Sequence, residues 1–297
     1  MFDKYTADIL RNSEAYFCQA SKLDDQFESA ISISKKIINN DFDGYMKDFL
    51  PIILEKVIPL SSKKIKETDI NNYFKNWKLD VKKFKNLVIK NDANIKKSKL
   101  DKLINFINNF QNIKKNRAMC NALKKIINIK NEIGVFSMTT RANNQPMWAW
   151  YANMYEGYVI EYDIDEYLNK NEEMKKELSY VNYSNERKNN PINILLNIFY
   201  DSLYRTLNIQ HDKSDVIKDI KSIINTKSID WRFQDEWRFF GKPETKVYIP
   251  IKAIYIGVNA SESNKDFIVK IAKEKGYKVY QQLNDYESTN IEFEQVI

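Results

Sequence analysis

The hydrophobic period of this chain changes at Gly134, and that change constrains the fold more than any other sequence feature. Before it, residues 29–132 contain a single glycine, Gly44, and three groups of residues recur at i, i+3, i+4 spacing. Those groups are Ile52, Ile53, Lys56 and Val57; Tyr73, Trp77, Val81 and Phe84; and Leu100, Leu103, Ile104 and Ile107. Such spacing is typical of amphipathic helices. Residues 29–132 are therefore predicted to be helical.

From Gly134 onward the apolar residues alternate or form short runs, which is typical of strands. Strands are predicted at 134–138, 158–163, 178–183, 237–241, 246–250, 253–258 and 277–281. Helices are predicted between them at 146–153, 164–176, 191–224 and 261–275, with Asp163 as an N-cap and Gly276 at a C′ position. A helical turn near residues 6–11 and a strand at 15–18 come first. The pattern predicts an α+β body of residues 1–28 and 133–297, with a large helical insertion at 29–132.

The charge is concentrated in the predicted insertion. Residues 61–130 contain 19 Lys and Arg against 5 Asp and Glu, a net of +14, whereas the whole chain carries +7. A concentration of this kind can mark a surface that binds nucleic acid or an acidic partner. It can equally be a set of solvated lysine-rich helix faces, since Arg117 is the one arginine in the stretch and arginine is the preferred phosphate reader.

Composition excludes several kinds of protein. The 18 tyrosines, 16 phenylalanines and 5 tryptophans are too many for a disordered chain. Six scattered glycines do not form a phosphate-binding loop or a dinucleotide fingerprint, and one histidine, His211, with two distant cysteines cannot build a zinc site, so we expect no metal. The two cysteines suit a reducing compartment, and no signal segment or long apolar run is present. We expect a soluble cytoplasmic protein without a membrane partner.

The residues best suited to chemistry lie in the segment from Trp231 to Phe240. Glu236 stands there between two tryptophans and two arginines, where the strand pattern begins. If residues 231–240 alternate as a strand, Glu236 and Arg238 share the face opposite Trp231 and Trp237. Glu236 is then either a working carboxylate or a structural anion paired with Arg232, Arg238 or the basic insertion.

Three segments of the chain share their motifs, in the same order, with a known bacterial family. The first joins Lys4-Tyr5 to residues 15–28, which resemble an aromatic strand that leads through a turn into Asn-Asp-Pro-Phe. The second comprises residues 134–137, 147–152 and 157–163, and the third runs from Lys227 through Trp231 and residues 236–238 to residues 253–257. Together the three segments resemble the bacterial domain of unknown function 2971 family. This chain departs from the family pattern at Asp24, Gln26 and Trp150, where the family has Asn, Pro and His.

The order of elements in that family looks like the ADP-ribosyltransferase-like fold of prokaryotic toxins in phage defence and toxin–antitoxin systems. The resemblance implies a split sheet, mixed or antiparallel, that binds NAD as a substrate in a cleft. It also implies that Glu236 is the catalytic glutamate, which would stabilise positive charge on the ribose as the glycosidic bond breaks. Residues expected to hold NAD are Lys4, Tyr5, Ser137, Trp148, Tyr151 and Arg238.

Other interpretations of the same residues stay open. Met147, Trp150 and Tyr151 share a helix face that could be core or pocket. The chain as a whole could be an intracellular effector that modifies a nucleic acid or a protein with NAD. It could instead be a non-catalytic nucleic-acid-binding module that uses the basic insertion. A third possibility is an interaction protein whose insertion docks an acidic, antitoxin-like neutralising partner.

Overall fold

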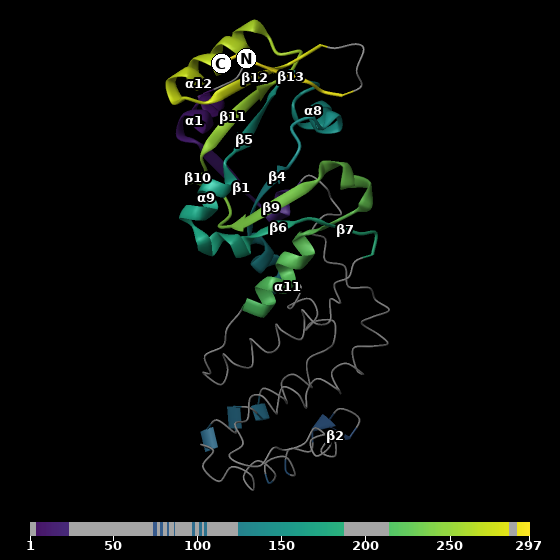
Figure 1. Cartoon of the computed structure of the whole chain (residues 1–297). Coiled ribbons are helices and arrows are strands. Elements are labelled where there is room, and N and C mark those ends of the chain that lie inside the picture. The colour runs from purple at the N-terminus through teal and green to yellow at the C-terminus, as the bar shows by residue number, and fades with distance from the viewer. Residues whose placement is uncertain are drawn as a thin grey trace. The chain divides into compact units, whose positions relative to one another are not determined.

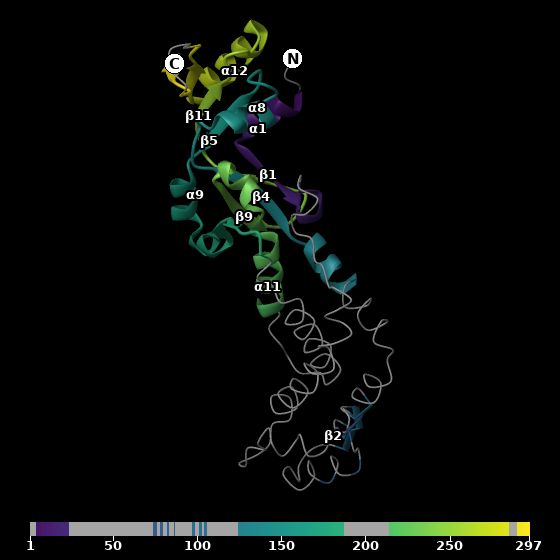
Figure 2. The ribbon, with the colours of Figure 1, turned by 90° about the vertical axis from the view of Figure 1, so that its right-hand side faces the viewer.

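The computed structural model describes residues 4–23, 124–186, 214–284 and 290–297, with isolated helix and strand positions between 74 and 105 (Figures 1 and 2). The chain divides into two compact units. The first contains residues 1–29, 130–186 and 224–297, and the second contains residues 30–129 and 187–223. The second unit thus holds residues 187–223, which the sequence predicts to lie in the α+β body. The helices predicted at 52–57 and 100–107 lie mostly outside the described residues, as do Asp24 and Gln26.

An antiparallel five-stranded sheet forms one part of the first unit. Its order is β10 (Thr245–Tyr248), β1 (Glu14–Gln19), β4 (Gly134–Thr139), β9 (Glu236–Gly241) and β6 (Leu178–Tyr180). Strand β1 pairs with β10 on one side and with β4 on the other. In Figure 2, β1, β4 and β9 lie side by side. The prediction that the N-terminal strand joins the sheet formed after Gly134 is confirmed.

A mixed four-stranded sheet forms the other part. Its order is β13 (Phe293–Gln295), β12 (Lys278–Gln282), β11 (Ile251–Ile256) and β5 (Tyr158–Tyr162). Strands β11 and β12 run parallel, so a crossover must connect them, and α12 (Glu262–Lys275) supplies it. Ser261 caps α12, and Gly276 ends it with a φ of 76°, as the sequence predicts for a C′ glycine.

Helices cover both faces of the four-stranded sheet. On one face, α1 (Lys4–Asn12) and α12 pack Leu10 and Ile268 against Ile254 and Ile256. On the other face, α8 (Gln145–Tyr151) places Trp148 near Tyr255 and Phe293. Alternate residues of β11 therefore enter two different cores, as the period of a strand requires.

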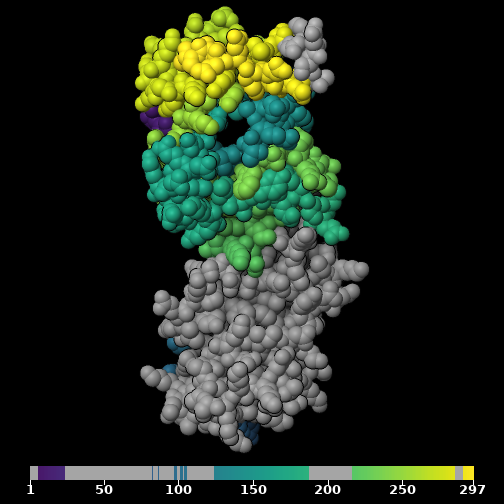
Figure 3. Space-filling view, viewed as in Figure 1, coloured from purple at the N-terminus to yellow at the C-terminus, as the bar shows by residue number. Residues whose placement is uncertain are grey.

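A third core belongs to the five-stranded sheet. Helix α9 (Ile164–Lys170) packs Tyr167 against Phe239, with ring centroids 5.9 Å apart, and Phe17 lies in the same cluster. Asp163 caps α9 by accepting a hydrogen bond from the backbone of Glu166, as predicted. The space-filling view in Figure 3 shows a hollow between the yellow and yellow-green C-terminal segments and the teal segments below them.

Several elements differ from the sequence prediction. Within residues 73–84, the strand pair β2 (Phe74–Lys75) and β3 (Lys78–Leu79) stands where helix is predicted, and its antiparallel pairing supplies the backbone hydrogen bonds that a helix would otherwise make internally. The strand predicted at 178–183 is split at Val181. Its second part, β7 (Asn182–Tyr183), pairs in parallel with β8 (Thr226–Lys227). The helix predicted at 164–176 ends at Lys170 and is followed by the 3₁₀ helix η2 (Glu172–Glu177).

Candidate functional site

The turn between η3 (Ile229–Gln234) and β9 positions the candidate site. Ser228 caps η3 with its side chain, and Asp235 ends η3 in the left-handed conformation, with a φ of 49°. The strand therefore begins at Glu236, and the alternation predicted from Trp231 holds only from that residue onward. Asp235 separates η3 from β9, and Gln234 and Glu236 on either side of it are both buried.

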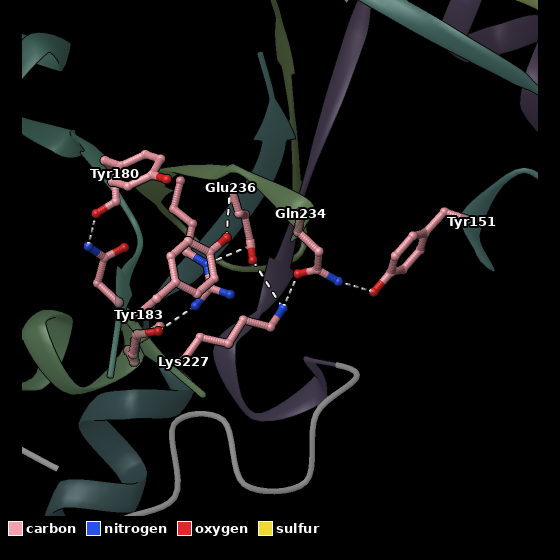
Figure 4. A network of polar contacts seen from close by, with 9 residues as sticks. Tyr151, Tyr180, Tyr183, Lys227, Gln234 and Glu236 are labelled. Carbon is pink, nitrogen blue, oxygen red and sulfur yellow. Dashed lines mark hydrogen bonds and ion pairs between the residues drawn. The ribbon is translucent and has the colours of Figure 1, made fainter. Parts of the chain in front are cut away.

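Glu236 lies in a buried network of charges (Figure 4). Its Oε1 is 2.7 Å from Nε of Arg238, and its Oε2 is 3.1 Å from Nζ of Lys227. The exposed fractions of the three side chains are 7%, 0% and 6%. Burial lowers the pKa of Arg238 to about 9, which leaves the guanidinium charged at neutral pH. Glu236 is thus the anion that two buried cations share.

Neighbouring backbone and tyrosine groups hold this network in place. Arg238 also donates to the backbone carbonyl of Ile224. The backbone N–H of Glu236 donates to the hydroxyl of Tyr183 over 2.9 Å, and burial raises the pKa of Tyr183 to about 12. The parallel pair of β7 and β8 brings Tyr183 and Lys227 to β9 from segments more than 40 residues apart.

Gln234 connects the buried charges to the surface. Its Oε1 accepts a hydrogen bond from Lys227 over 2.6 Å, and its Nε2 donates to the hydroxyl of Tyr151 over 2.8 Å. Tyr151 ends α8, and 48% of it is exposed. A continuous chain of polar contacts therefore runs from an exposed phenol through Gln234 and Lys227 to Glu236 and Arg238 (Figure 4).

A second polar cluster surrounds Asp235 at the surface. Its carboxylate accepts hydrogen bonds from Thr140 over 2.8 Å and from Tyr180 over 2.9 Å, and Nε of Arg141 lies 3.4 Å away. The hydrogen bonds from Thr140 and Tyr180 lower the pKa of Asp235. Asn144 adds a hydrogen bond to the carbonyl of Phe233. These contacts fix the loop that leads from β4 into α8 against the turn before β9.

Aromatic rings lie next to the polar chain. Trp150 meets Trp231 edge to face, with centroids 5.8 Å apart, and Trp231 contacts Phe233 at 5.9 Å. The ammonium of Lys227 stands 5.1 Å from the centroid of the Trp231 ring. Trp150 is 68% exposed, so the helix face shared by Trp150 and Tyr151 is largely surface rather than core.

The structure brings some of the predicted site residues together and separates others. Tyr151, Glu236 and Arg238 belong to one polar chain, and Ser137 on β4 is the register partner of Arg238. Ser137 therefore projects from the same face of the sheet as Glu236, and it is exposed. Lys4 and Tyr5 begin α1, and their side chains lie outside the described part of the chain. Helix α1 packs on the four-stranded sheet, whereas Glu236 belongs to the five-stranded one.

Two residues expected to contact NAD have buried side chains. Trp148 is 1% exposed and belongs to the core around Ile291 and Phe293, where its Nε1 donates to the carbonyl of Ala142. Arg238 is fully buried behind Glu236. Their observed contacts are with the protein itself: Trp148 anchors α8, and Arg238 pairs with the glutamate.

Sequence reasoning missed Lys227, Gln234 and Tyr183. Lys227 lies within the segment that resembles the known family, but it had no expected role. One signal could have found Lys227. Apolar and aromatic residues follow it closely, which indicates burial, and a lysine is almost never fully buried without an acidic or polar partner. Its partner, Glu236, is nine residues further along the chain, beyond the reach of local patterns.

No helix among the described residues is long and apolar enough to cross a membrane.

No curated protein and no solved structure matches this chain. One family model does match a segment of it, and that segment contains Tyr151, Lys227, Gln234, Glu236 and Arg238, the whole polar chain. Residues 147–239 are similar to the family described as "Protein of unknown function (DUF2971)".

Proposed function

We propose that this chain is an ADP-ribosyltransferase-like effector that uses NAD to modify a macromolecule, with Glu236 as the catalytic carboxylate. The observation that carries the proposal is the polar chain from exposed Tyr151 to buried Glu236. These contacts join the carboxylate of Glu236, at the start of β9, to Tyr151 at the end of α8, the helix that follows β4. The family match over residues 147–239 covers the same segment.

The architecture supports the same reading at a coarser level. An antiparallel sheet and a mixed sheet meet in one unit, and a hollow is visible beside them in Figure 3. A split sheet with a cleft is what the ADP-ribosyltransferase-like type requires. Within the proposal, Ser137 and Tyr151 approach the ligand from the strand β4 and the helix α8.

The chemistry proposed for Glu236 is electrostatic. When the bond between the ribose C1′ and the nicotinamide nitrogen breaks, the electron pair leaves with nicotinamide and positive charge develops on the ribose. A fixed carboxylate stabilises that charge, as carboxylates do in glycoside chemistry. An ionised carboxylate has about four lone-pair positions, so Glu236 can accept a ribose hydroxyl beside its two cations.

Access to Glu236 sets a condition on this mechanism. Its side chain is only 7% exposed, and Lys227 and Gln234 stand between it and Tyr151 (Figure 4). A ribose that approaches from the Tyr151 side reaches the carboxylate only after the ammonium of Lys227 has moved. The proposal therefore includes a displacement of Lys227 when the ligand binds.

Nicotinamide release from NAD by the full chain tests the proposal. Tyr151→Phe removes the hydroxyl that accepts from Gln234, and loss of one neutral hydrogen bond should slow NAD consumption by about tenfold. The matched control is Tyr248→Phe, because Tyr248 is 61% exposed on β10, and β1 and β4 separate that strand from β9. Glu236→Gln should reduce turnover by about 100-fold or more at a temperature where the variant is folded.

Absence of NAD consumption in the parent protein would refute the enzyme. If nucleic acid then bound with an affinity that fell steeply with salt, the basic insertion would define a binding module instead. Induced expression tests the effector role separately, since growth arrest should occur with the parent chain and not with Glu236→Gln. Relief of that arrest by a co-expressed neighbouring gene would identify a neutralising partner.

A further inference from the structure

Trp150 is exposed to an unusual degree for its position. It lies on the seven-residue helix α8, two residues after Trp148, yet Trp148 is 1% exposed and Trp150 is 68% exposed. Tryptophan is the largest apolar side chain and is usually well covered. The helix is already anchored by Trp148, so packing does not require a second tryptophan here.

The indole of Trp150 is nevertheless supported on one side by a second ring. Trp231 contacts it edge to face, with an interplanar angle of 85°. Trp231 is fixed in turn by Phe233 and by the ammonium of Lys227, which is bound to Glu236 and Gln234. A preorganised ring with most of its surface open loses little conformational entropy when a planar group stacks on it.

Positive charge lies beside these rings. Arg232, between Trp231 and Phe233 in the sequence, is exposed and forms no ion pair with a described residue. Arg232 directly follows Trp231 in η3, and the ring of Trp231 meets Trp150. The exposed carboxylate in this segment, Asp230, is engaged by the hydroxyl of Ser228 over 3.0 Å. An aromatic platform next to an exposed arginine suits a ligand with a planar ring and a phosphate.

We propose that Trp150 is the stacking residue of a mononucleotide site and that Arg232 binds the phosphate of the same ligand. The inference rests on the proposed function and deepens it, because NAD contains two such mononucleotide halves. It also replaces buried Trp148 with Trp150 as the tryptophan that contacts the ligand. Lys227 lies over the ring of Trp231 and pairs with Glu236, so it connects a ligand ring stacked on Trp150 to the buried ion pair.

Calorimetric titration of the full chain with AMP, nicotinamide mononucleotide and adenosine tests the site. Trp150→Ala should weaken binding of one mononucleotide by about tenfold or more, the usual loss for one stacked base, while Trp150→Phe stays within about threefold of the parent. Arg232→Ala should weaken the mononucleotide and leave adenosine unchanged. Tyr248→Ala, which removes an exposed aromatic ring on β10, is the control and should change nothing.

The outcomes separate this inference from the proposed function. Mononucleotide binding that depends on Trp150 supports the site even if the protein consumes no NAD. The preferred ligand, AMP or nicotinamide mononucleotide, identifies which half of NAD stacks there. If the parent protein consumes NAD, consumption that Trp150→Ala leaves unchanged would overturn the inference, and so would the absence of binding of either mononucleotide. Binding of single-stranded poly-dT through Trp150 without mononucleotide binding would overturn it as well and assign the surface to nucleic acid.

Discussion

Replacing Glu236 by glutamine should destabilise the first unit through the cations left behind. The carboxylate is shared by Lys227 and Arg238, and none of the three side chains is more than 7% exposed. Removing one partner of a buried ion pair costs about 3–5 kcal/mol. Glutamine keeps the shape and can still accept one hydrogen bond through its amide oxygen, so the lower end, about 3 kcal/mol, applies.

That loss should be large enough to measure in two ways. For a unit of about 160 residues, Tm falls by roughly 2–4 °C for each kcal/mol, so Glu236→Gln should lower Tm by about 6–12 °C. Chemical denaturation gives the free energy of unfolding directly. Glu244→Gln is the matched control, because that carboxylate is 57% exposed, and its Tm should not change measurably.

A double-mutant cycle then identifies the cause. In the Glu236→Gln protein, Lys227→Met removes one of the two uncompensated cations, so the double variant should be more stable than the two single losses predict. The coupling should reach about 1 kcal/mol or more for groups in direct contact. A Tm within about 2 °C of the parent, or strictly additive losses, would refute the shared-anion account.

Three further changes test the backbone and the surface cluster. Gly257→Ala would place a Cβ 2.1 Å from the carbonyl oxygen of Tyr155, so thermal unfolding should show a loss of about 2–3 kcal/mol from overpacking. Gly276→Ala meets no atom within 4 Å, so it should lose only about 1 kcal/mol from its positive φ, and equal losses at both glycines would contradict this distinction. The pKa of Asp235 is lowered in the folded chain, so its stabilising contribution is present above the unfolded pKa and is lost as the pH falls through the folded value. Urea unfolding between pH 2 and 6 should show a smaller loss in Asp235→Asn than in the parent, and identical pH profiles would refute the role of the carboxylate.

Local sequence determined most of the regular elements in the first unit. Strands β4, β5, β9 and β11 occur close to where alternation and short apolar runs predict them, because a half-buried strand imposes a period of two. The caps at Asp163 and Gly276 were equally predictable, since each satisfies groups within its own helix end. Glu236 stood out because few other residues in the chain suit chemistry.

Only the tertiary structure decided which side chains are buried at the site. Trp148 and Trp150 are two residues apart on one helix, and the difference between them comes from Ile291 and Phe293, about 140 residues further along. Lys227 reaches Glu236 because β8 pairs with β7, and Asp235 turns η3 into β9 where alternation alone predicts a continuous strand. Burial and ion pairing depend on segments distant in sequence, whereas period and capping depend on neighbours, and this is why local patterns predict the elements but not the network around Glu236.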